Sequence, residues 1–565
     1  SLTGKENQLK IGVRGLLKGA KLNFYIDSIS DSNLIGTYTL AADSAVGAKT
    51  VSLSKFLPAG VHKIFVQASG TASTNLANLD YFTFVCNSDY TASLPAYSGG
   101  TSSGWMTYDC GQHFGLSNTG TQSKMRIVTG TTASQFLTFG TTLKEKGYTV
   151  LYEKKIASAE DYNRHYKFLS PDGSHVIYTY FVSAYSETRI IVDTNVDTLR
   201  NYTYKGTGNY TKRTELYMVP FSASEDGFLY SSDYGSQNRN NAGAMYVIRM
   251  ADNSLFIIDG GSYIQMSDRD CERIYALLRR ITGIPEGQKI TINTWFVTHY
   301  HDDHVSGLPR FLSKYYAEFD LHNIMYNFDV VGASGDNMEI VGKLYPNAKY
   351  YKPHTGEILT VCDVTFDVLY TVEDLYTPDS SNKLTLSDAG CMRKSNEENN
   401  CSCVLRLNMG GKKILLTGDI YDADRILIAM YPAADLRADV LQIPHHGFDG
   451  HVTLVKAIAP TISFINQNES SMGNRKSNYN NNRGWAPYAG TIYYGNSELV
   501  GYCAETGIFL REPFTEAVDW LSWGNLTRDM DEANPYTSGA VTDSDQYYRY
   551  DRVTTTPSTI SGTYM

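Results

Sequence analysis

The chain has 565 residues, with 49 Lys and Arg against 59 Asp and Glu, and a formal net charge of -10. At about 100–200 residues per domain, this length predicts several domains with ample core. An acidic chain without a clustered basic stripe makes nucleic acid an unfavoured partner, because proteins meet its phosphates with Lys and Arg. No stretch approaches the roughly 18 uninterrupted apolar residues of a spanning helix, which excludes an integral membrane protein of that kind.

Cysteine usage and the start of the chain bear on the compartment. The eight cysteines are scattered and form no Cys-x-x-Cys pair, so neither a zinc ribbon nor a disulfide scaffold is predicted. The chain begins at Ser1, contains 43 tyrosines and has only 19% charged residues. From these features we expect a secreted or cell-surface protein.

Residues 1–86 contain short alternating strands separated by Gly, Ser, Asp and Asn, which predicts a β-sandwich. The segments 57–66 (LPAGVHKIFV) and 78–84 (NLDYFTF) resemble the closing strands of carbohydrate-binding modules of the family 6/35 type. That resemblance implies a sugar-binding module, and a sandwich that binds nothing is the alternative.

The rest of the chain divides by its patterns. Residues 87–104 are rich in Ser and Gly and are expected to be a linker. Residues 105–224 mix strands with a helix over 133–146 and predict a small α+β unit of unknown role. From 225 to 525 buried strands alternate with helices, which favours two layered sheets with outer helices. Residues 526–565 lack periodicity and are expected to be a C-terminal surface segment.

Three of the twelve histidines lie within six residues, directly after an apolar strand pattern at 291–297. His299 and His301 fall on the same side of an extended backbone because strand side chains alternate. Asp303 and His304 add a carboxylate and another imidazole as the chain turns into a helix. Nitrogen and oxygen ligands of this kind suit Zn²⁺, with Mn²⁺ or Fe as alternatives, and two pairs of them predict two adjacent metal positions.

Further acids and histidines follow three other apolar strands. Asp419 follows 414–417, Asp259 follows 256–258, and His445 and His446 follow 441–443. A carboxylate such as Asp419 can bridge two metals, since each of its oxygens can bind one ion. The adjacent imidazoles are expected to point apart, so that only one of them is a ligand. We favour His445 for that role, with His446 as the alternative.

The order and spacing of these residues resemble the metallo-β-lactamase superfamily, whose signature His-x-His-x-Asp-His is matched at 299–304. The segments Leu-Leu-Thr-Gly-Asp and Ile-Pro-His-His-Gly look most like the hydrolase domain of ComEC/Rec2-type DNA-uptake proteins. The resemblance covers about 225–525 and implies an αββα sandwich with the site at one edge between the sheets. It implies one metal on His299 and His301, a second on Asp303, His304 and His445, and Asp419 as the bridge.

One superfamily ligand has no counterpart here. Many members place another His between the signature and the bridging Asp, where this chain reads Asn-Asn-Cys-Ser-Cys at 399–403. Asn400 or Cys401 could take that place, and Asp259 is a further substitute ligand or site-lining residue.

The resemblance implies metal-assisted hydrolysis by a metal-bound hydroxide. Asp303 would orient the nucleophile, and His446 would protonate the leaving group. The expected substrate is a phosphoester in glycan or cell-wall material. The alternatives are a lactam or thioester, a nuclease or phosphodiesterase of DNA processing, and a non-catalytic glycan-binding protein.

Overall fold

The computed structural model describes residues 8–53, 57, 60–71, 75–85, 90–108, 123–155, 164–194, 200–221, 243–261, 268–328, 333–386, 398–447, 451–466, 483–495 and 498–514. The expected C-terminal segment 526–565 lies outside these residues. The chain divides into two compact units. One comprises Ser1–Tyr97, Thr141–Val150 and Phe168–Ile177, and the other Ser98–Gly140, Leu151–Lys167 and Tyr178–Met565.

The first unit contains two three-stranded antiparallel sheets. One has the order β4 (Gly47–Ser52), β1 (Gln8–Gly15), β6 (Ala77–Val85), and the other β3 (Leu34–Thr39), β2 (Lys21–Ile26), β5 (Ile64–Ser69). Alternate apolar residues of both sheets, such as Leu9 and Ile11 of β1 and Leu22 and Phe24 of β2, form one core. Residues 1–86 therefore contain two sheets that bury a common apolar interior.

A seven-stranded sheet follows in the chain, with a helix beside it. Its order is β10 (Thr149–Lys155), β11 (Arg164–Leu169), β12 (Val176–Val182), β13 (Glu187–Asp193), β9 (Ser123–Thr129), β7 (Thr101–Ser102), and β8 (Met106–Tyr108) also pairs with β9. Helix α1 (Ala133–Glu145) packs Phe136 against Tyr166 and Phe181. Because β7 pairs with β9, the last part of the expected linker 87–104 belongs to this sheet.

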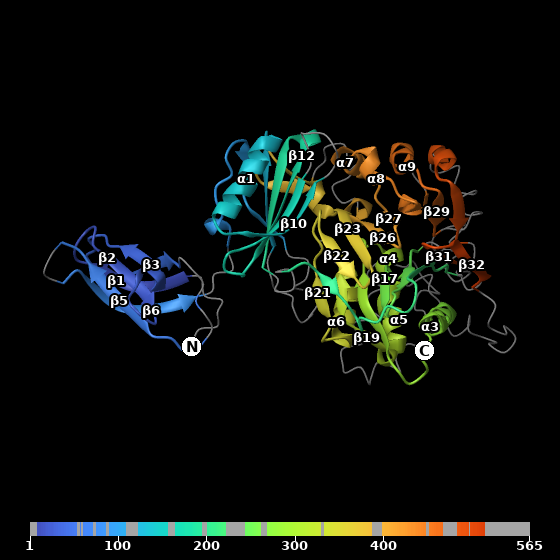
Figure 1. Ribbon diagram of the computed structural model, residues 1–565, viewed down its shortest axis with the longest axis horizontal. Coiled ribbons are helices and arrows are strands. Elements are labelled where there is room, and N and C mark those ends of the chain that lie inside the picture. Colours follow the sequence, from blue (N-terminus) through green and yellow to red (C-terminus); the bar gives the residue numbers. More distant parts are fainter. Residues whose placement is uncertain are drawn as a thin grey trace, which may run out of the picture. The chain divides into compact units, whose positions relative to one another are not determined.

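Two large sheets make up most of the second unit (Figure 1). The nine-stranded sheet has the order β21 (Lys349–Tyr351), β20 (Asn323–Met325), β18 (Ile290–Phe296), β17 (Leu255–Ile258), β16 (Tyr246–Arg249), β15 (Glu215–Met218), β31 (Glu498–Cys503), β32 (Gly507–Pro513), with β19 (Phe319–Leu321) on β18. The eight-stranded sheet has the order β14 (Thr203–Tyr204), β22 (Ile358–Val361), β23 (Val364–Tyr370), β26 (Val404–Met409), β27 (Lys412–Leu416), β28 (Val440–Gln442), β29 (Ile462–Ile465), β30 (Thr491–Tyr494). A hairpin of β24 (Tyr376–Pro378) and β25 (Leu384–Leu386) stands apart from both.

The two large sheets share a single apolar core. Phe256 of β17 stacks on Phe366 of β23 with ring centroids 4.3 Å apart, and the buried cluster draws side chains from most strands of both sheets. The helices of this region are α3 (Asp268–Thr282), α4 (Asp302–Val305), α5 (Gly307–Tyr315), α6 (Ala333–Leu344), α7 (Asp424–Met430), α8 (Ala433–Leu436) and α9 (Val452–Ile458). The region is therefore a mixed α/β structure built around two facing sheets.

The strand pairing sets where side chains at strand ends can meet. β17 runs parallel to β18, and β27 runs parallel to β28. Parallel neighbours end at the same edge of a sheet, so residues that follow these strands are brought together. Both sheets also begin earlier than the boundary expected at 225, because β14 and β15 belong to them.

Buried ion pairs connect the seven-stranded sheet with the segment that flanks β22 and β23. Lys167 Nζ of β11 lies 3.0 Å from Glu357 Oε1, and both side chains are fully buried. His354 lies between Asp193 of β13 and Glu373, with nitrogen–oxygen distances of 2.8 and 2.6 Å. The seven-stranded sheet is therefore tied to the larger sheets by charges that no solvent reaches.

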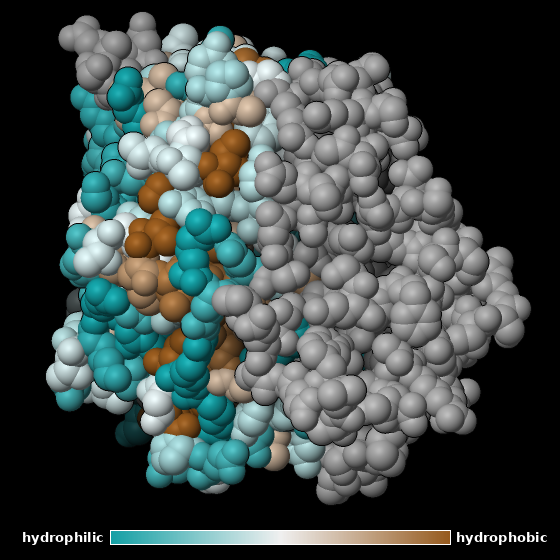
Figure 2. All heavy atoms as spheres, turned by 90° about the vertical axis from the view of Figure 1, so that its right-hand side faces the viewer, coloured by the Kyte–Doolittle hydropathy of each residue, from teal (hydrophilic) through white to brown (hydrophobic). Residues whose placement is uncertain are grey.

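The surface of the side that carries α3, β31 and β32 is mixed. Among its coloured residues, hydrophobic side chains form separate patches between hydrophilic ones (Figure 2). None of the helices in the described segments is long and apolar enough to span a membrane.

Candidate metal centre

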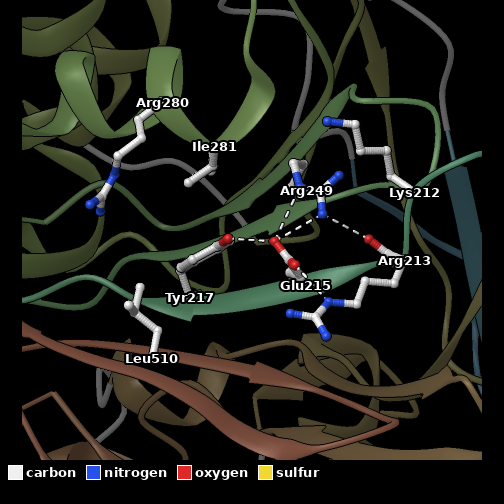
Figure 3. Close-up of a pocket in the computed structure, with 8 residues that line it drawn as sticks. All are labelled: Lys212, Arg213, Glu215, Tyr217, Arg249, Arg280, Ile281 and Leu510. Carbon is white, nitrogen blue, oxygen red and sulfur yellow. Dashed lines mark hydrogen bonds and ion pairs between the residues drawn. The ribbon is translucent and has the colours of Figure 1, made fainter.

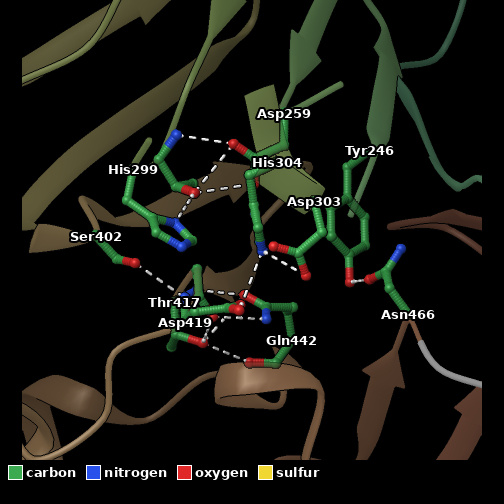
Figure 4. A network of polar contacts seen from close by, with 12 residues as sticks. Tyr246, Asp259, His299, Asp303, His304, Ser402, Thr417, Asp419, Gln442 and Asn466 are labelled. Carbon is green, nitrogen blue, oxygen red and sulfur yellow. Dashed lines mark hydrogen bonds and ion pairs between the residues drawn. The ribbon is translucent and has the colours of Figure 1, made fainter. Parts of the chain in front are cut away.

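The polar residues that follow four strands converge at one place (Figure 4). His299 comes three residues after β18, Asp259 directly after β17, Asp419 three residues after β27, and His446 four residues after β28. The last residues of these strands are buried, and the parallel pairing of β17 with β18 and of β27 with β28 holds these ends in register. The site thus draws residues from both large sheets.

Four side chains form a compact cluster of acids and imidazoles. One ligand atom from each of Asp303, His304, Asp419 and His446 can be chosen so that all four lie within 4.8 Å of one another. His446 Nε2 is 3.0 Å from Asp303 Oδ2 and 3.1 Å from Asp419 Oδ2, and His304 Nε2 is 3.1 Å from Asp419 Oδ2. Two carboxylates and two imidazoles are a donor set that suits a divalent transition metal.

The remaining histidines of the signature lie beside this cluster. The ring of His299 is 4.9 Å from that of His301 and 4.2 Å from that of His304, measured between centroids. His299 Nε2 and Asp419 Oδ1 are buried and make no hydrogen bond within the described part of the chain. Buried polar atoms without partners are costly, and a cation among them would supply the missing interaction. The residues present therefore fit a bound metal.

Asp259 lies behind the cluster and contacts it through His304. Its Oδ2 accepts a hydrogen bond from His304 Nδ1 (2.8 Å), and its Oδ1 accepts from the backbone N–H of Thr298 (2.8 Å). An imidazole that donates from Nδ1 presents the lone pair of Nε2, which is the form a metal requires. The structure therefore makes Asp259 a positioning residue for His304 rather than a substitute ligand, because Thr298 and His304 already occupy both of its oxygens.

Asp419 is held in place by a tight turn. Its backbone N–H donates to Ser402 Oγ (2.9 Å), and the preceding Gly418 has φ of +54°. A Cβ on Gly418 would lie 2.8 Å from Ser402 Oγ, so the turn needs glycine both for its conformation and for this close approach. Gln442 braces the same turn, accepting from the N–H of Thr417 (2.7 Å) and donating to the carbonyl of Gly418 (2.9 Å).

Asn400 and Cys401 do not belong to the acid–imidazole cluster. Asn400 Oδ1 accepts hydrogen bonds from the backbone N–H groups of Tyr421 (3.1 Å) and Ala423 (2.9 Å), so it stabilises the chain after Asp419. Cys401 is buried in the same turn and lies outside the cluster. The interpretation of these two residues as substitute ligands finds no support in this geometry.

The structure distinguishes the two adjacent histidines. His446 enters the cluster, whereas His445 Nε2 is 3.4 Å from Asn399 Nδ2, and its ring packs edge-on against Tyr421. His445, His446 and Gly447 all have positive φ, at 49°, 51° and 81°. This left-handed run turns the second imidazole, not the first, toward Asp303 and Asp419. Of the adjacent pair, His446 is therefore the residue that lies in the acid–imidazole cluster, although the sequence favoured His445 as the ligand.

The charges of the site act on each other strongly. Burial lowers the pKa of His446, but Asp419 and Asp303 outweigh it and raise that pKa to about 9. Burial raises the pKa of Asp419, but the imidazoles of His304 and His446 outweigh burial and hold this pKa well below its usual value. For His299, burial and then the neighbouring His304 lower the pKa well below normal. The candidate metal centre therefore combines ionised carboxylates with the neutral imidazole of His299.

Two residues near the cluster were not singled out from the sequence. The hydroxyl of Tyr246 donates to Asn466 Oδ1, which leaves Asn466 Nδ2 buried without a partner in the described residues (Figure 4). Asn466 directly follows β29, which runs parallel to β28. Asn466 could have been found in the sequence by the same pattern as Asp419 and His446, because each is a polar residue after a short apolar strand.

Among known proteins, no family model and no curated protein matches the chain. Among solved structures, 15% of the chain is 29% identical to a glycoside hydrolase family 43 arabinoxylan arabinofuranohydrolase from Bacillus subtilis, over 17% of that protein (TM-score 0.13). CmlA, a diiron β-hydroxylase from Streptomyces venezuelae, matches at 11% identity over 50% of this chain and 48% of its own (TM-score 0.25). Human tRNase Z, short form, matches at 14% identity over 44% of this chain and 90% of its own (TM-score 0.23).

The chain spans less than half the length of the first two of these proteins. We therefore base the function on the side chains of the site.

Proposed function

We propose that the chain is a metal-dependent hydrolase of the metallo-β-lactamase type, with an αββα arrangement of the two large sheets. The observation that carries the proposal is the cluster of Asp303, His304, Asp419 and His446, in which Asp303 is partly exposed and the other three are buried. Its ligand types fit Zn²⁺ first, with Mn²⁺ or Fe as alternatives. When bound, such an ion polarises an oxygen of the substrate and lowers the pKa of water.

Two metal positions are consistent with the arrangement of the donors. The four-residue cluster would hold one ion, and His299 and His301 would hold the other. Asp419 would lie between them, because its Oδ2 faces His304 and His446 while its Oδ1 is buried and has no hydrogen-bond partner in the described segments. Asp259 would keep His304 in the tautomer that offers Nε2.

The substrate we propose is a phosphoester in glycan or cell-wall material, acted on outside the cell. The sequence resemblance to the ComEC-type hydrolase domain and to carbohydrate-binding modules supports this choice. Asn466 Nδ2 would donate a hydrogen bond to a substrate oxygen, since Tyr246 binds the amide oxygen and the NH₂ group has no hydrogen-bond partner among the described residues.

Metal analysis combined with a substrate panel tests the proposal. The purified protein should contain one to two equivalents of a transition metal and hydrolyse bis(p-nitrophenyl) phosphate or p-nitrophenyl phosphate, with loss of activity on chelation. Asp419→Asn should lose metal and activity together, whereas Asp320→Asn, an exposed acid paired with His322, should keep both. Metal content unchanged in Asp419→Asn would refute the site. Bound metal without phosphoester hydrolysis would refute the substrate class.

A further inference from the structure

A cavity lies at the start of β15 and the end of β16, where Glu215 and Arg249 line it (Figure 3). It has a volume of about 430 Å³ and is lined by Lys212, Arg213, Glu215, Tyr217, Arg249, Arg280, Ile281 and Leu510. These residues come from β15 and the chain before it, from β16, from the end of α3 and from β32. Four of the eight are cations and one is an acid.

The strand register separates this cavity from the metal centre. Glu215 pairs with Arg249, whereas Met218 pairs with Tyr246, whose other neighbour Ile258 precedes Asp259. Three residues of strand correspond to about 10 Å at roughly 3.4 Å per residue. The cavity is therefore a different site from the one that holds the acid–imidazole cluster.

The single carboxylate of the cavity is fully engaged by its neighbours. Glu215 Oε1 accepts from Arg213 Nε (2.8 Å), and Oε2 accepts from Tyr217 Oη (2.5 Å) and Arg249 Nη2 (2.9 Å). Burial raises the pKa of Glu215, but these bonds lower it below the usual value, so the group is ionised at neutral pH. Glu215 neutralises about one of the four positive charges, so the side chains that line the cavity keep a net positive charge.

The cations differ in what they already bind. Arg249 is nearly fully buried and is fixed by Glu215, by Asn253 Oδ1 (3.3 Å) and by the carbonyl of Arg213 (2.9 Å). Arg280 pairs with Glu512. In contrast, within the described segments Lys212 Nζ and both Nη atoms of Arg213 make no hydrogen bond or ion pair, although the guanidinium of Arg213 is held 4.7 Å from the Phe509 ring.

We propose that this cavity binds a small organic oxyanion through Lys212 and Arg213. A guanidinium fork and an ammonium are the groups that recognise phosphate and carboxylate oxygens, and the cavity brings these exposed cations together beside the buried Arg249. Ile281 and Leu510 offer apolar walls to the uncharged part of the ligand, and the volume lies in the usual range for small-molecule sites. The proposal does not depend on the metal centre or on hydrolysis.

Calorimetric titration with inorganic phosphate tests the site on the full chain. Wild-type protein should show saturable binding, and Lys212→Gln with Arg213→Gln should weaken it at least about tenfold, because each removed cation deletes a charge-assisted hydrogen bond. Arg511→Gln is the matched control: it removes a cation from β32 that pairs with Glu498 outside the cavity, and it should bind phosphate as the wild type does. If the double variant folds poorly, phosphate binding can be measured in the single variant Lys212→Gln instead.

Two further arms separate this site from the metal centre and identify the ligand. Asp419→Asn should retain the phosphate binding that the double variant loses. Glucose 6-phosphate and glucuronate then distinguish a phosphoryl from a carboxylate ligand, and competition by either supports an oxyanion site. Absence of saturable binding by all three compounds, or equal affinity in wild type and the double variant, would overturn the proposal.

Discussion

Replacing Asp259 by Asn tests the link between a residue outside the metal ligands and metal affinity. Asn tolerates the left-handed backbone that Asp259 adopts, with φ of +57°, so the turn should survive. The Thr298 hydroxyl lies within 3.0 Å of both carboxylate oxygens, and two further donors, the Thr298 N–H and His304 Nδ1, bind different oxygens. An amide has only one oxygen, so one of these two donors must face an NH₂ group.

The size of the effect follows from which donor loses its acceptor. If the amide oxygen stays with Thr298, His304 must accept at Nδ1 and carry its proton on Nε2, the atom that faces Asp419. Loss of such an orienting partner typically costs 10–100-fold in metal affinity, which is about 1.4–2.7 kcal/mol. If the oxygen stays with His304, a buried N–H is left without a partner, at a cost of about 1–3 kcal/mol in stability.

Competition with a chelator measures metal affinity, and urea unfolding of the metal-free protein measures stability. Asp259→Asn should be impaired in at least one of the two measurements. Asp320→Asn, which changes the same residue type in an exposed pair with His322 at 2.9 Å, should match the wild type in both. Wild-type metal affinity together with wild-type stability in Asp259→Asn would refute the role given to this carboxylate.

Three other outcomes are expected. His446→Ala should lose bound metal while His445→Ala keeps it, and equal metal content in both would contradict the cluster. Gly418→Ala should lower both the melting temperature and metal occupancy, whereas Gly411→Ala, at φ of +78° with open space around it, should show only the conformational cost of roughly 1–2 kcal/mol. Burial lowers the pKa of His354 but its two carboxylate partners raise it to about 9, above the usual 6.5. The resulting stabilisation is complete below the usual pKa and is lost as pH rises through about 9, so urea unfolding should show a pH-dependent loss absent from His354→Gln.

Much of the site could be anticipated from the sequence because its residues follow short apolar runs. Asp259, His299, Asp419 and His446 each come shortly after a strand that ends in mostly hydrophobic residues. Such runs can be recognised without tertiary information, and parallel pairing then brings their ends together. The spacing of His299 and His301 adds a local geometric constraint that needs no knowledge of the fold.

The choice between His445 and His446 could not be made in the same way. Both residues adopt positive φ, which is rare for a residue other than glycine and is imposed by the surrounding structure. The role of Asp259 depends on His304, 45 positions later in the chain, and the partner of β15 at its outer side is β31, almost 300 residues away. Contacts over such distances in sequence leave no local pattern.

The buried charges between the seven-stranded sheet and the larger sheets make the two parts dependent on each other for folding. A chain shortened to begin at 225 would lack β14 and β15, one strand from each large sheet, and would also lose Lys167 and Asp193. Glu357 would then be an uncompensated ion in an apolar interior, a loss worth about 3–5 kcal/mol for a broken buried pair. That is a large part of the usual net stability of a domain. The residues before 225 would thus be needed for the stability of the two large sheets, because they supply the counter-charges of Glu357 and His354.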